Sequence, residues 1–190
     1  RAKDYTRFIL QQRVGDVCID FEETRADLTI VEVPQDSVGF VMGRGGKVLR
    51  SLEEQWGTLM FFAKRRGSKS GPRTDEAEKL AIFGPRTGRR GAELKVMSAV
   101  EHKHKGWFCA DDGESLKKPL AMIPGAPEWG FQTRVLRKDE FSYALGGGGS
   151  TRKKLAAASG CILEFVGSIA IMAVSVYFSF HRMTEYSPLI

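Results

Sequence analysis

The stretch VGFVMGRGGKVLRSLEEQWGTLMFF, residues 38–62, contains the signals that determine the fold of the surrounding chain. Apolar residues recur at helical spacing on either side of the run GRGG at 43–46, which predicts two short helices, over 35–42 and 47–56. Glycine readily ends a helix and reverses the chain, so the run predicts a tight turn between them. The stretch therefore indicates two helices joined by a glycine turn and followed by a strand.

The flanking sequence supplies strands and a closing helix. The run LTIVEV at 28–33 is rich in β-branched residues and is halted by Pro34, so it predicts a strand that ends where the first helix begins. Together, the further elements expected here are strands over 15–20, 28–33, 58–63 and 80–83 and a helix over 92–101. The charged residues that follow the last strand are expected to be solvated, as charge runs usually are: Arg86, Arg89, Arg90 and Lys95.

The same pattern occurs a second time, at an offset of 103 residues that places Gly43 on Gly146 without gaps. Apolar, basic and glycine positions are all kept over about 27 residues, far more than similar composition would produce. The second copy predicts a strand over 131–136, helices over 139–145 and 150–159, and strands over 161–166 and 168–173.

These patterns predict an α+β fold of two tandem units with β-α-α-β-β-α order, each a three-stranded antiparallel sheet backed by helices. The first unit is expected over 14–105 and the second, more divergent, over 129–190. Residues 106–128, rich in Gly, Pro and charge, are interpreted as a linker.

The first thirteen residues form a separate segment in this interpretation. Residues 1–13 share a pattern with residues 182–190, so they are interpreted as the closing helix of an upstream unit. Their apolar face needs a surface to cover it, since burial of a large apolar side chain contributes about 1.5–3 kcal/mol. We therefore expect an ordered helix docked on the first unit, with Tyr5 or Phe8 buried.

A glycine turn at the start of a helix suits a phosphate group. Glycines leave no Cβ to hold a phosphate away, and the free N–H groups and dipole of the following helix point at the same place. Lys47 and Arg50 add positive charge one turn apart after the first turn. The chain as a whole carries a formal net charge of +6, which favours a polyanionic partner.

The stretch 38–62 resembles the core of a type I KH domain, and residues 27–101 cover the whole unit. This resemblance implies that a GXXG loop clamps single-stranded RNA and that bases lie in an apolar groove beside it. In the first unit it assigns RNA contacts to Gly43, Arg44, Gly45, Gly46, Lys47 and Arg50, with Val38, Val41, Val48, Leu49, Leu59 and Phe61 in the groove. In the second unit it assigns them to Gly146, Gly147, Gly148, Gly149, Ser150, Arg152 and Lys153. The second turn departs from the first because no basic residue lies within it.

The expected function is therefore binding of single-stranded nucleic acid, RNA more than DNA, with other KH units or protein subunits as further partners. A different class of function is left open: a protein-interaction scaffold in a ribonucleoprotein assembly that uses degenerate KH folds. Salt dependence distinguishes the two, because phosphate contacts weaken steeply with salt and apolar protein interfaces do not.

Other classes of function find little support in the residues. No enzyme is expected: Val41 and Val48 occupy positions where a phosphate-binding loop of nucleotide hydrolases needs Gly and Ser or Thr. No metal and no cofactor is expected, because the group His102, His104, Cys109 and Asp111 fits no zinc spacing. The apolar run 161–180 could span a bilayer by length, but the repeat assigns its first part to strands, so no membrane contact is expected. Three widely spaced cysteines fit a reducing, intracellular compartment.

Overall fold

The structure is a computed structural model that describes residues 1–21, 25–65, 77–118, 120 and 129–175. The chain divides into two compact units, Arg1–Val96 and Met97–Ile190. This division falls inside helix α4 (Arg86–Lys103), whereas the sequence placed the end of the first domain at residue 105.

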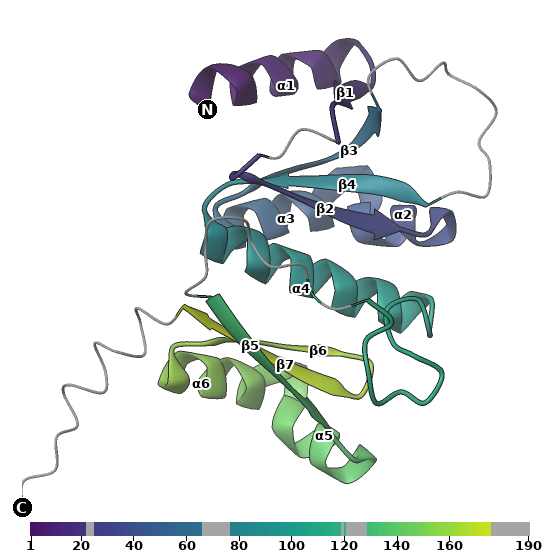
Figure 1. Ribbon diagram of the computed structural model, residues 1–190, viewed down its shortest axis with the longest axis vertical. Helices are drawn as coiled ribbons and strands as arrows, with labels where there is room; N and C mark the ends of the chain where they lie inside the picture. The colour runs from purple at the N-terminus through teal and green to yellow at the C-terminus, as the bar shows by residue number, and fades with distance from the viewer. Residues whose placement is uncertain (22–24, 66–76, 119, 121–128, 176–190) are drawn as a thin grey trace, which may run out of the picture. The chain divides into compact units, whose positions relative to one another are not determined.

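The first unit is a sheet with helices on both faces, as Figure 1 shows. Its elements are α1 (Ala2–Val14), β1 (Val17–Ile19), β2 (Leu28–Val33), α2 (Gln35–Met42), α3 (Lys47–Trp56), β3 (Leu59–Arg65), β4 (Glu78–Phe83) and the first part of α4. Pro34 precedes α2, and Gly57, in the left-handed conformation, ends α3. These helices and β2 have the bounds that the sequence predicts.

The sheet of the first unit has four strands in the order β1-β3-β4-β2, so the prediction of a three-stranded antiparallel sheet was wrong for this unit. The additional strand is β1, which pairs in parallel with the end of β3 from Ala63 to Arg65. Val17 and Ile19 are buried on one side of this short strand, and their burial accounts for its place in the sheet.

Helix α1 docks on the sheet face opposite α2 and α3 (Figure 1). Phe8 is 4% exposed, and its ring centroid lies 5.5 Å from that of Phe61 and 5.1 Å from that of Phe83. The expectation of an ordered, docked helix with Phe8 buried is confirmed.

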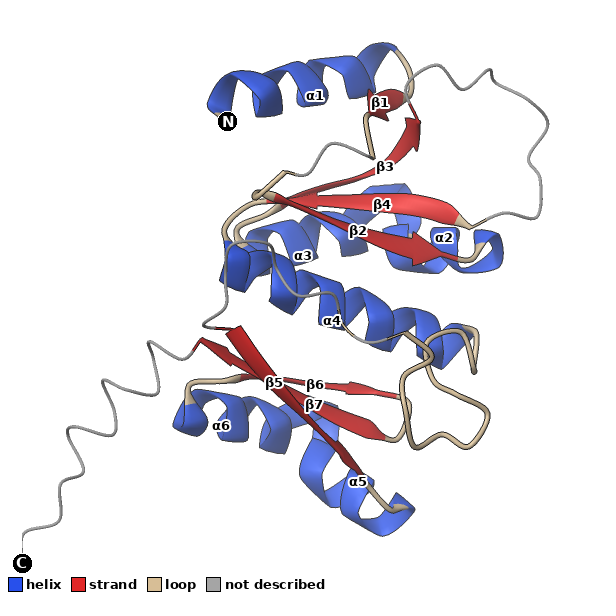
Figure 2. Ribbon diagram, viewed as in Figure 1, coloured by secondary structure: helices blue, strands red, loops and turns tan. Residues whose placement is uncertain are grey.

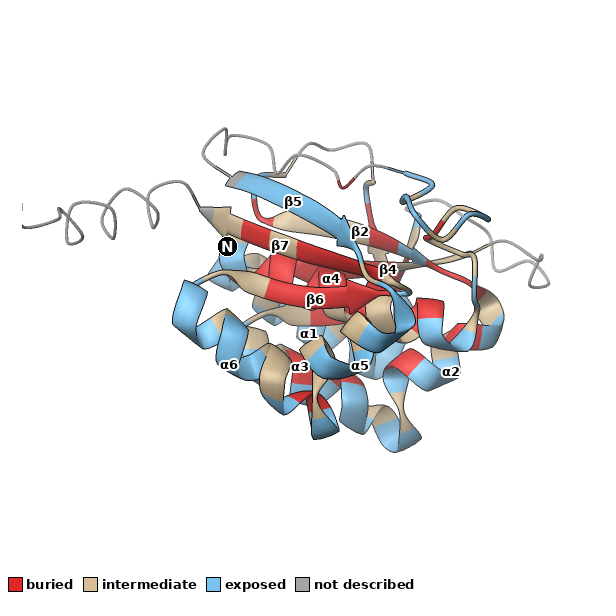
Figure 3. Ribbon diagram, turned by 90° about the horizontal axis from the view of Figure 1, so that it is seen from below, coloured by how far each residue is buried: buried red, intermediate tan, exposed pale blue. Residues whose placement is uncertain are grey.

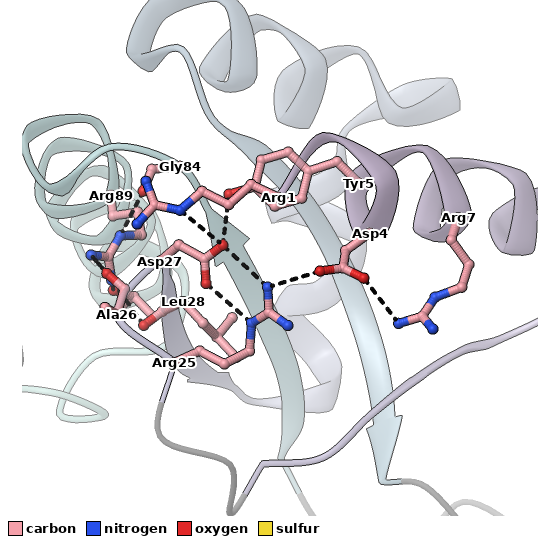
Figure 4. A network of polar contacts seen from close by, with 11 residues as sticks. Arg1, Asp4, Tyr5, Arg7, Arg25, Ala26, Asp27, Leu28, Gly84 and Arg89 are labelled. Carbon is pink, nitrogen blue, oxygen red and sulfur yellow. Dashed lines mark hydrogen bonds and ion pairs between the residues drawn. The ribbon is translucent and has the colours of Figure 1, made fainter.

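Polar contacts fix the same helix at its N-terminal end, as Figure 4 shows. The Tyr5 hydroxyl donates to Asp27 Oδ2 over 3.1 Å, and Arg25 pairs with both Asp27 and Asp4 at 3.1 and 3.7 Å. Asp27 is buried; burial raises the pKa of its carboxyl, but the hydrogen bonds from Arg25 and Tyr5 outweigh burial and hold the pKa below its ordinary value.

The arginines at the start of α4 are not solvated as expected. Arg89 is fully buried and donates to the carbonyls of Gly84, Leu28 and Ala26 over 2.7–3.0 Å. Arg90 is buried too and pairs with Glu93 over 2.6 Å. Burial is tolerated because the backbone acceptors and a carboxylate satisfy these guanidinium groups.

Figure 2 shows the helices of the second unit in blue and its strands in red. Its elements after α4 are β5 (Trp129–Val135), α5 (Lys138–Leu145), α6 (Ser150–Ser159), β6 (Ile162–Val166) and β7 (Ile169–Ser175). The sheet is three-stranded and antiparallel in the order β5-β7-β6, which matches the order β2-β4-β3 of the first unit. Leu163, Phe165 and Ala170 form its core on the side of α5 and α6.

The apolar run 161–180 is strand as far as Ser175, and its last five residues lie outside the described residues. Among the helices that the structure describes, none has both the length and the apolarity needed to cross a bilayer. In contrast to β6 and β7, the edge strand β5 is exposed from Gly130 to Val135 (Figure 3).

Part of the expected linker is folded onto the second unit. The buried Glu101 carboxylate accepts hydrogen bonds from the backbone N–H groups of Gly106, Phe108 and Cys109 over 2.6, 2.8 and 3.2 Å. The Cys109 thiol in turn lies 3.4 Å from the Val166 carbonyl oxygen. Residues 104–118 therefore belong structurally to the second unit, and 121–128 lie outside the described residues.

Candidate nucleic-acid interface

The turn between α2 and α3 depends on glycine at three positions. Gly43, Gly45 and Gly46 all have positive φ, at 69°, 59° and 75°, in the region that other residues rarely adopt. A Cβ at Gly43 would also lie 2.3 Å from the Val48 side chain, so a larger residue could not be accommodated. At Gly45 a Cβ would meet no atom within 4 Å, so the tip of the turn is open.

The turn between α5 and α6 has nearly the same backbone. Gly146 has φ 68° and ψ 169° where Gly43 has 69° and 172°, and Gly148 has 59° and 23° where Gly45 has 59° and 27°. A Cβ at Gly146 would likewise lie 2.3 Å from the side chain of Thr151. The offset of 103 residues in the sequence therefore corresponds to a repeated local structure.

Each turn leads directly into the N-terminus of a ten-residue helix, α3 or α6. Neither Gly46 nor Gly149 can cap its helix with a side chain, and no side-chain cap is present. The N–H groups of Lys47 and Ser150 donate to the Arg44 and Gly147 carbonyls of the turns. The positive end of the helix dipole still favours an anion at both sites. In the first unit Arg44 and Lys47 are exposed beside this end, as are Ser150 and Lys153 in the second.

The two predicted arginines after the turns have other contacts. Arg50 is exposed and donates to the carbonyl of Gly45, so it stays at the turn. Arg152 is 12% exposed in its side chain, and its Nη1 donates to the Leu163 carbonyl over 2.8 Å and to Glu164 over 2.9 Å. Arg152 is therefore not a free cation at the surface, because a buried carboxylate compensates its charge.

The apolar residues predicted to line a groove lie at different depths. Val41 is 1% exposed and Phe61 4%; Phe61 packs against α1 with Phe8, on the sheet face away from the glycine turn. Both belong to the core, so neither lines an accessible groove. Val38 and Leu59 are half-buried.

Other apolar side chains are exposed near the turns, and sequence reasoning assigned no contact to Phe40, Met42 or Tyr143. Phe40, Met42 and Val48 are exposed around the first turn. Phe40 is 47% exposed, and Tyr143, which falls on it at the offset of 103, is 85% exposed. The signal was available: both units keep an aromatic residue three positions before the turn.

A carboxylate at the edge of the first sheet was also missed. Glu53 of α3 accepts a hydrogen bond from the Met60 N–H over 2.7 Å. Burial raises the pKa of this carboxyl; the Met60 N–H and the nearby Arg50 guanidinium lower it, and burial prevails. The sequence gives no indication of this contact, because a single Glu in a predicted helix is usually expected to be exposed.

No group of three or more His, Cys, Asp or Glu residues in the described parts of the chain is arranged to hold a metal ion. The three cysteines are free, and burial raises the pKa of the Cys109 thiol to about 12. A thiol with this pKa stays protonated at neutral pH and is a poor nucleophile.

Most of the first unit matches a known protein family. Residues 28–98 match the KH domain family, and this segment begins with β2 and ends within α4. No curated protein matches the chain.

Several solved structures are similar at low sequence identity. Dim2p from Pyrococcus horikoshii is 13% identical over 85% of this chain and 92% of that chain, with a TM-score of 0.33. A complex of a/eIF2alpha, aDim2p and rRNA from the same organism gives 12% identity over 85% and 86%, with a TM-score of 0.33. The first KH type I domain of human vigilin is 18% identical over 57% of this chain and 94% of that chain, again with a TM-score of 0.33.

Proposed function

We propose that this chain binds single-stranded RNA through the glycine turn at 43–46, because residues 28–98 match the KH domain family. The turn and the uncapped N-terminus of α3 hold the sugar-phosphate backbone, with Arg44 and Lys47 as charge partners. The bases then lie against the exposed apolar side chains of Phe40, Met42 and Val48 and the half-buried Val38. Single-stranded DNA is the weaker candidate partner.

One observation carries this proposal: an open glycine tip leads directly into a helix N-terminus that has no side-chain cap. A connection that served only to reverse the chain would not need an unobstructed tip flanked by exposed cations. The positive end of the α3 dipole favours an anion at this tip, and a phosphate binds there at low cost in entropy, since the site already has its bound shape.

We further propose that the second unit is a divergent KH-like domain. The repeated turn geometry and the repeated strand order support this assignment. Its turn has no basic residue within it, and Arg152 is neutralised by Glu164, so it contributes less charge than the first. We expect it to bind RNA more weakly, through the Gly146–Gly149 turn and Lys153.

A protein-interaction scaffold is the second candidate function, and the second unit favours it. Phe131 and Val135 are exposed on the edge strand β5, together with Tyr143 and Leu155 on the helices. An exposed edge strand with apolar side chains can pair with an extended segment of another protein.

Salt dependence of RNA binding tests the proposed function against this alternative. The full chain is titrated with short single-stranded RNA at two salt concentrations by fluorescence anisotropy. About three phosphate contacts predict a slope of about −2 in log affinity against log salt. Absence of RNA binding, or binding that salt does not weaken, would contradict the proposal.

A further inference from the structure

The second unit contains a pocket of about 640 Å³ to which neither glycine turn contributes. Four segments form its walls: the C-terminal part of α4, a hairpin over residues 108–117, the turn between β6 and β7, and α5. A volume of this size is ordinary for a ligand site and has room for a short peptide segment. The pocket is therefore separate from the residues proposed to contact RNA.

Hydrogen bonds hold the walls of the pocket in place without a ligand. The Glu101 carboxylate of α4 accepts from the N–H groups of Gly106 and Cys109, at the start of the hairpin segment. The Ser168 hydroxyl, in the turn between β6 and β7, donates to the Gly113 carbonyl near the tip of the hairpin over 2.7 Å. A pocket that already has its bound shape costs little conformational entropy to fill.

An aromatic surface forms one side of the pocket. Phe141 of α5 and Phe165 of β6 both line it, and their ring centroids lie 5.2 Å apart. Phe165 is buried, whereas Phe141 is half-buried, so part of the Phe141 ring is accessible to a ligand. The face of an aromatic ring attracts a cation placed over it.

The charged groups of the pocket are mainly acidic, although the whole chain has a formal net charge of +6. Among the described residues that line it are three carboxylates, one lysine and one histidine: Glu101, Asp111, Asp112, Lys105 and His102. With the histidine counted as neutral, the carboxylates outnumber the lysine. Burial is the main cause of the high pKa of the Cys109 thiol, which also lines the pocket, and the Glu101 and Asp112 carboxylates raise this pKa further. The pocket therefore has a negative potential.

Two of the carboxylates have acceptor capacity left for a ligand. Glu101 is occupied by backbone N–H groups, so it contributes its charge and not a further hydrogen bond. Asp111 is fully exposed, and its contact with Lys117 is a long one of 3.8 Å. Asp112 accepts the Glu114 N–H through Oδ1 over 2.8 Å, and its Oδ2 has no partner within the described parts of the chain.

We propose that this pocket binds an arginine-containing basic segment of a partner protein. It offers a guanidinium group an aromatic face on Phe141 and carboxylate acceptors on Asp111 and Asp112, a combination that suits arginine better than lysine. The same carboxylates repel phosphate, so the pocket does not extend the RNA site. This inference does not depend on RNA binding by either glycine turn.

The test uses a fluorescein-labelled peptide of alternating glycine and arginine, titrated with the full chain without RNA and followed by fluorescence anisotropy. Its counterpart has citrulline in place of every arginine, which keeps the shape and removes the charge. The unmodified chain should bind the arginine peptide at least about tenfold more tightly than the citrulline peptide. A basic chain repels a basic peptide in general, so this binding requires a local acidic site.

Amide NMR signals locate the bound peptide. The signals of Gly113 and Gly167, which line the pocket, should shift on titration with the arginine peptide. Those of Gly45 and Gly148, within the two glycine turns, should not. Shifts of Gly113 and Gly167 with an RNA oligonucleotide and not with the peptide would assign the pocket to RNA and overturn the inference.

Asp111→Asn with Asp112→Asn should lower the affinity for the arginine peptide about tenfold, because the amides keep the shape and lose the charge. The matched control, Glu114→Gln with Asp139→Asn, removes two exposed carboxylates of the same unit that do not line the pocket. It should change the affinity less than about twofold. Circular dichroism verifies that each variant is folded.

Lys105→Gln tests the opposite direction. It removes the lysine from the pocket and should raise the affinity for the arginine peptide about threefold. Lys103→Gln, at an exposed residue of the same helix outside the pocket, should not. Equal affinities for the arginine and citrulline peptides, or an affinity that Asp111→Asn with Asp112→Asn does not alter, would overturn the inference.

Discussion

Gly91 illustrates how one residue fixes the packing of the first unit. A Cβ at this position of α4 would lie 2.2 Å from ring atoms of Trp56, so the helix can approach α3 only because no side chain intervenes. Gly91→Ala should destabilise the chain by about 1–3 kcal/mol through overpacking, measured by urea unfolding. Gly39→Ala is the matched control: a Cβ there meets no atom within 4 Å, so the variant should be unchanged or slightly more stable. Equal stabilities of the two variants would contradict this account of the packing.

Asp27 should give the fold a dependence on acid pH. Its pKa in the folded chain is below the ordinary value of 3.8, so the carboxylate stabilises the fold above that pH. This contribution is lost as the pH falls through the ordinary value and then through the lower folded value. Asp27→Asn should cost about 2 kcal/mol at neutral pH, and the difference from the unmodified chain should shrink below about pH 4.

The comparison is made by chemical unfolding at a series of pH values. Asp111→Asn, a change at a fully exposed side chain, should leave the unfolding free energy at neutral pH unaltered. A constant difference between Asp27→Asn and the unmodified chain at every pH would show that the lowered pKa is not the cause.

Single residues show where sequence reasoning succeeds and where it fails. Gly43 and Gly57 were predictable because a positive φ leaves glycine as the preferred residue. Arg89 was not, because its partners Leu28 and Ala26 lie 61 and 63 residues away and nothing local marks the contact. The contact of Glu53 was missed for a similar reason, because its partner is a backbone N–H at the edge of a strand.

Helix α1 has a single buried side chain, Phe8. Phe8 packs between the rings of Phe61 and Phe83, so Phe8→Ala should cost about 3–5 kcal/mol and release the helix from the sheet. Leu10→Ala in the same helix, at a side chain 61% exposed, should change stability by less than about 0.5 kcal/mol. Limited proteolysis between α1 and β2 reports the release; equal cleavage rates for the two variants would refute the docking.

Most elements follow from local pattern, and the exceptions have a physical cause. Helices α2, α3 and α6 have the predicted bounds because capping prolines and glycines mark their ends. The pairing of β1 with β3 could not be read from the sequence, since three residues show too little alternation and parallel partners are distant in the chain. α4 begins six residues before its prediction because its buried arginines and glycines conceal the apolar period.

At the scale of the whole molecule, Glu101 joins part of the expected linker to the second unit. Its carboxylate holds three backbone N–H groups of the segment that the sequence suggested to be a linker. In Glu101→Gln we expect faster hydrogen exchange at Gly106, Phe108 and Cys109, by about 30-fold for a loss of about 2 kcal/mol. Lys103→Gln, on the exposed side of the helix, should leave these rates unchanged. Unchanged hydrogen-exchange rates in Glu101→Gln would show that Glu101 does not hold this segment, as expected of a simple linker.

The central claim is that the first glycine turn holds RNA. Arg44→Asp with Gly45→Asp places two carboxylates at an exposed tip where no atom would clash, so the fold should survive with a cost of about 1 kcal/mol for Asp at positive φ. The neutral control, Arg44→Gln with Gly45→Asn, has nearly the same shape without the repulsion. The most direct measurement is the Kd of the full chain for short single-stranded RNA. The account predicts at least about a tenfold loss of affinity in the Asp variant and a much smaller loss in the control. An unchanged Kd in a folded Asp variant would contradict it.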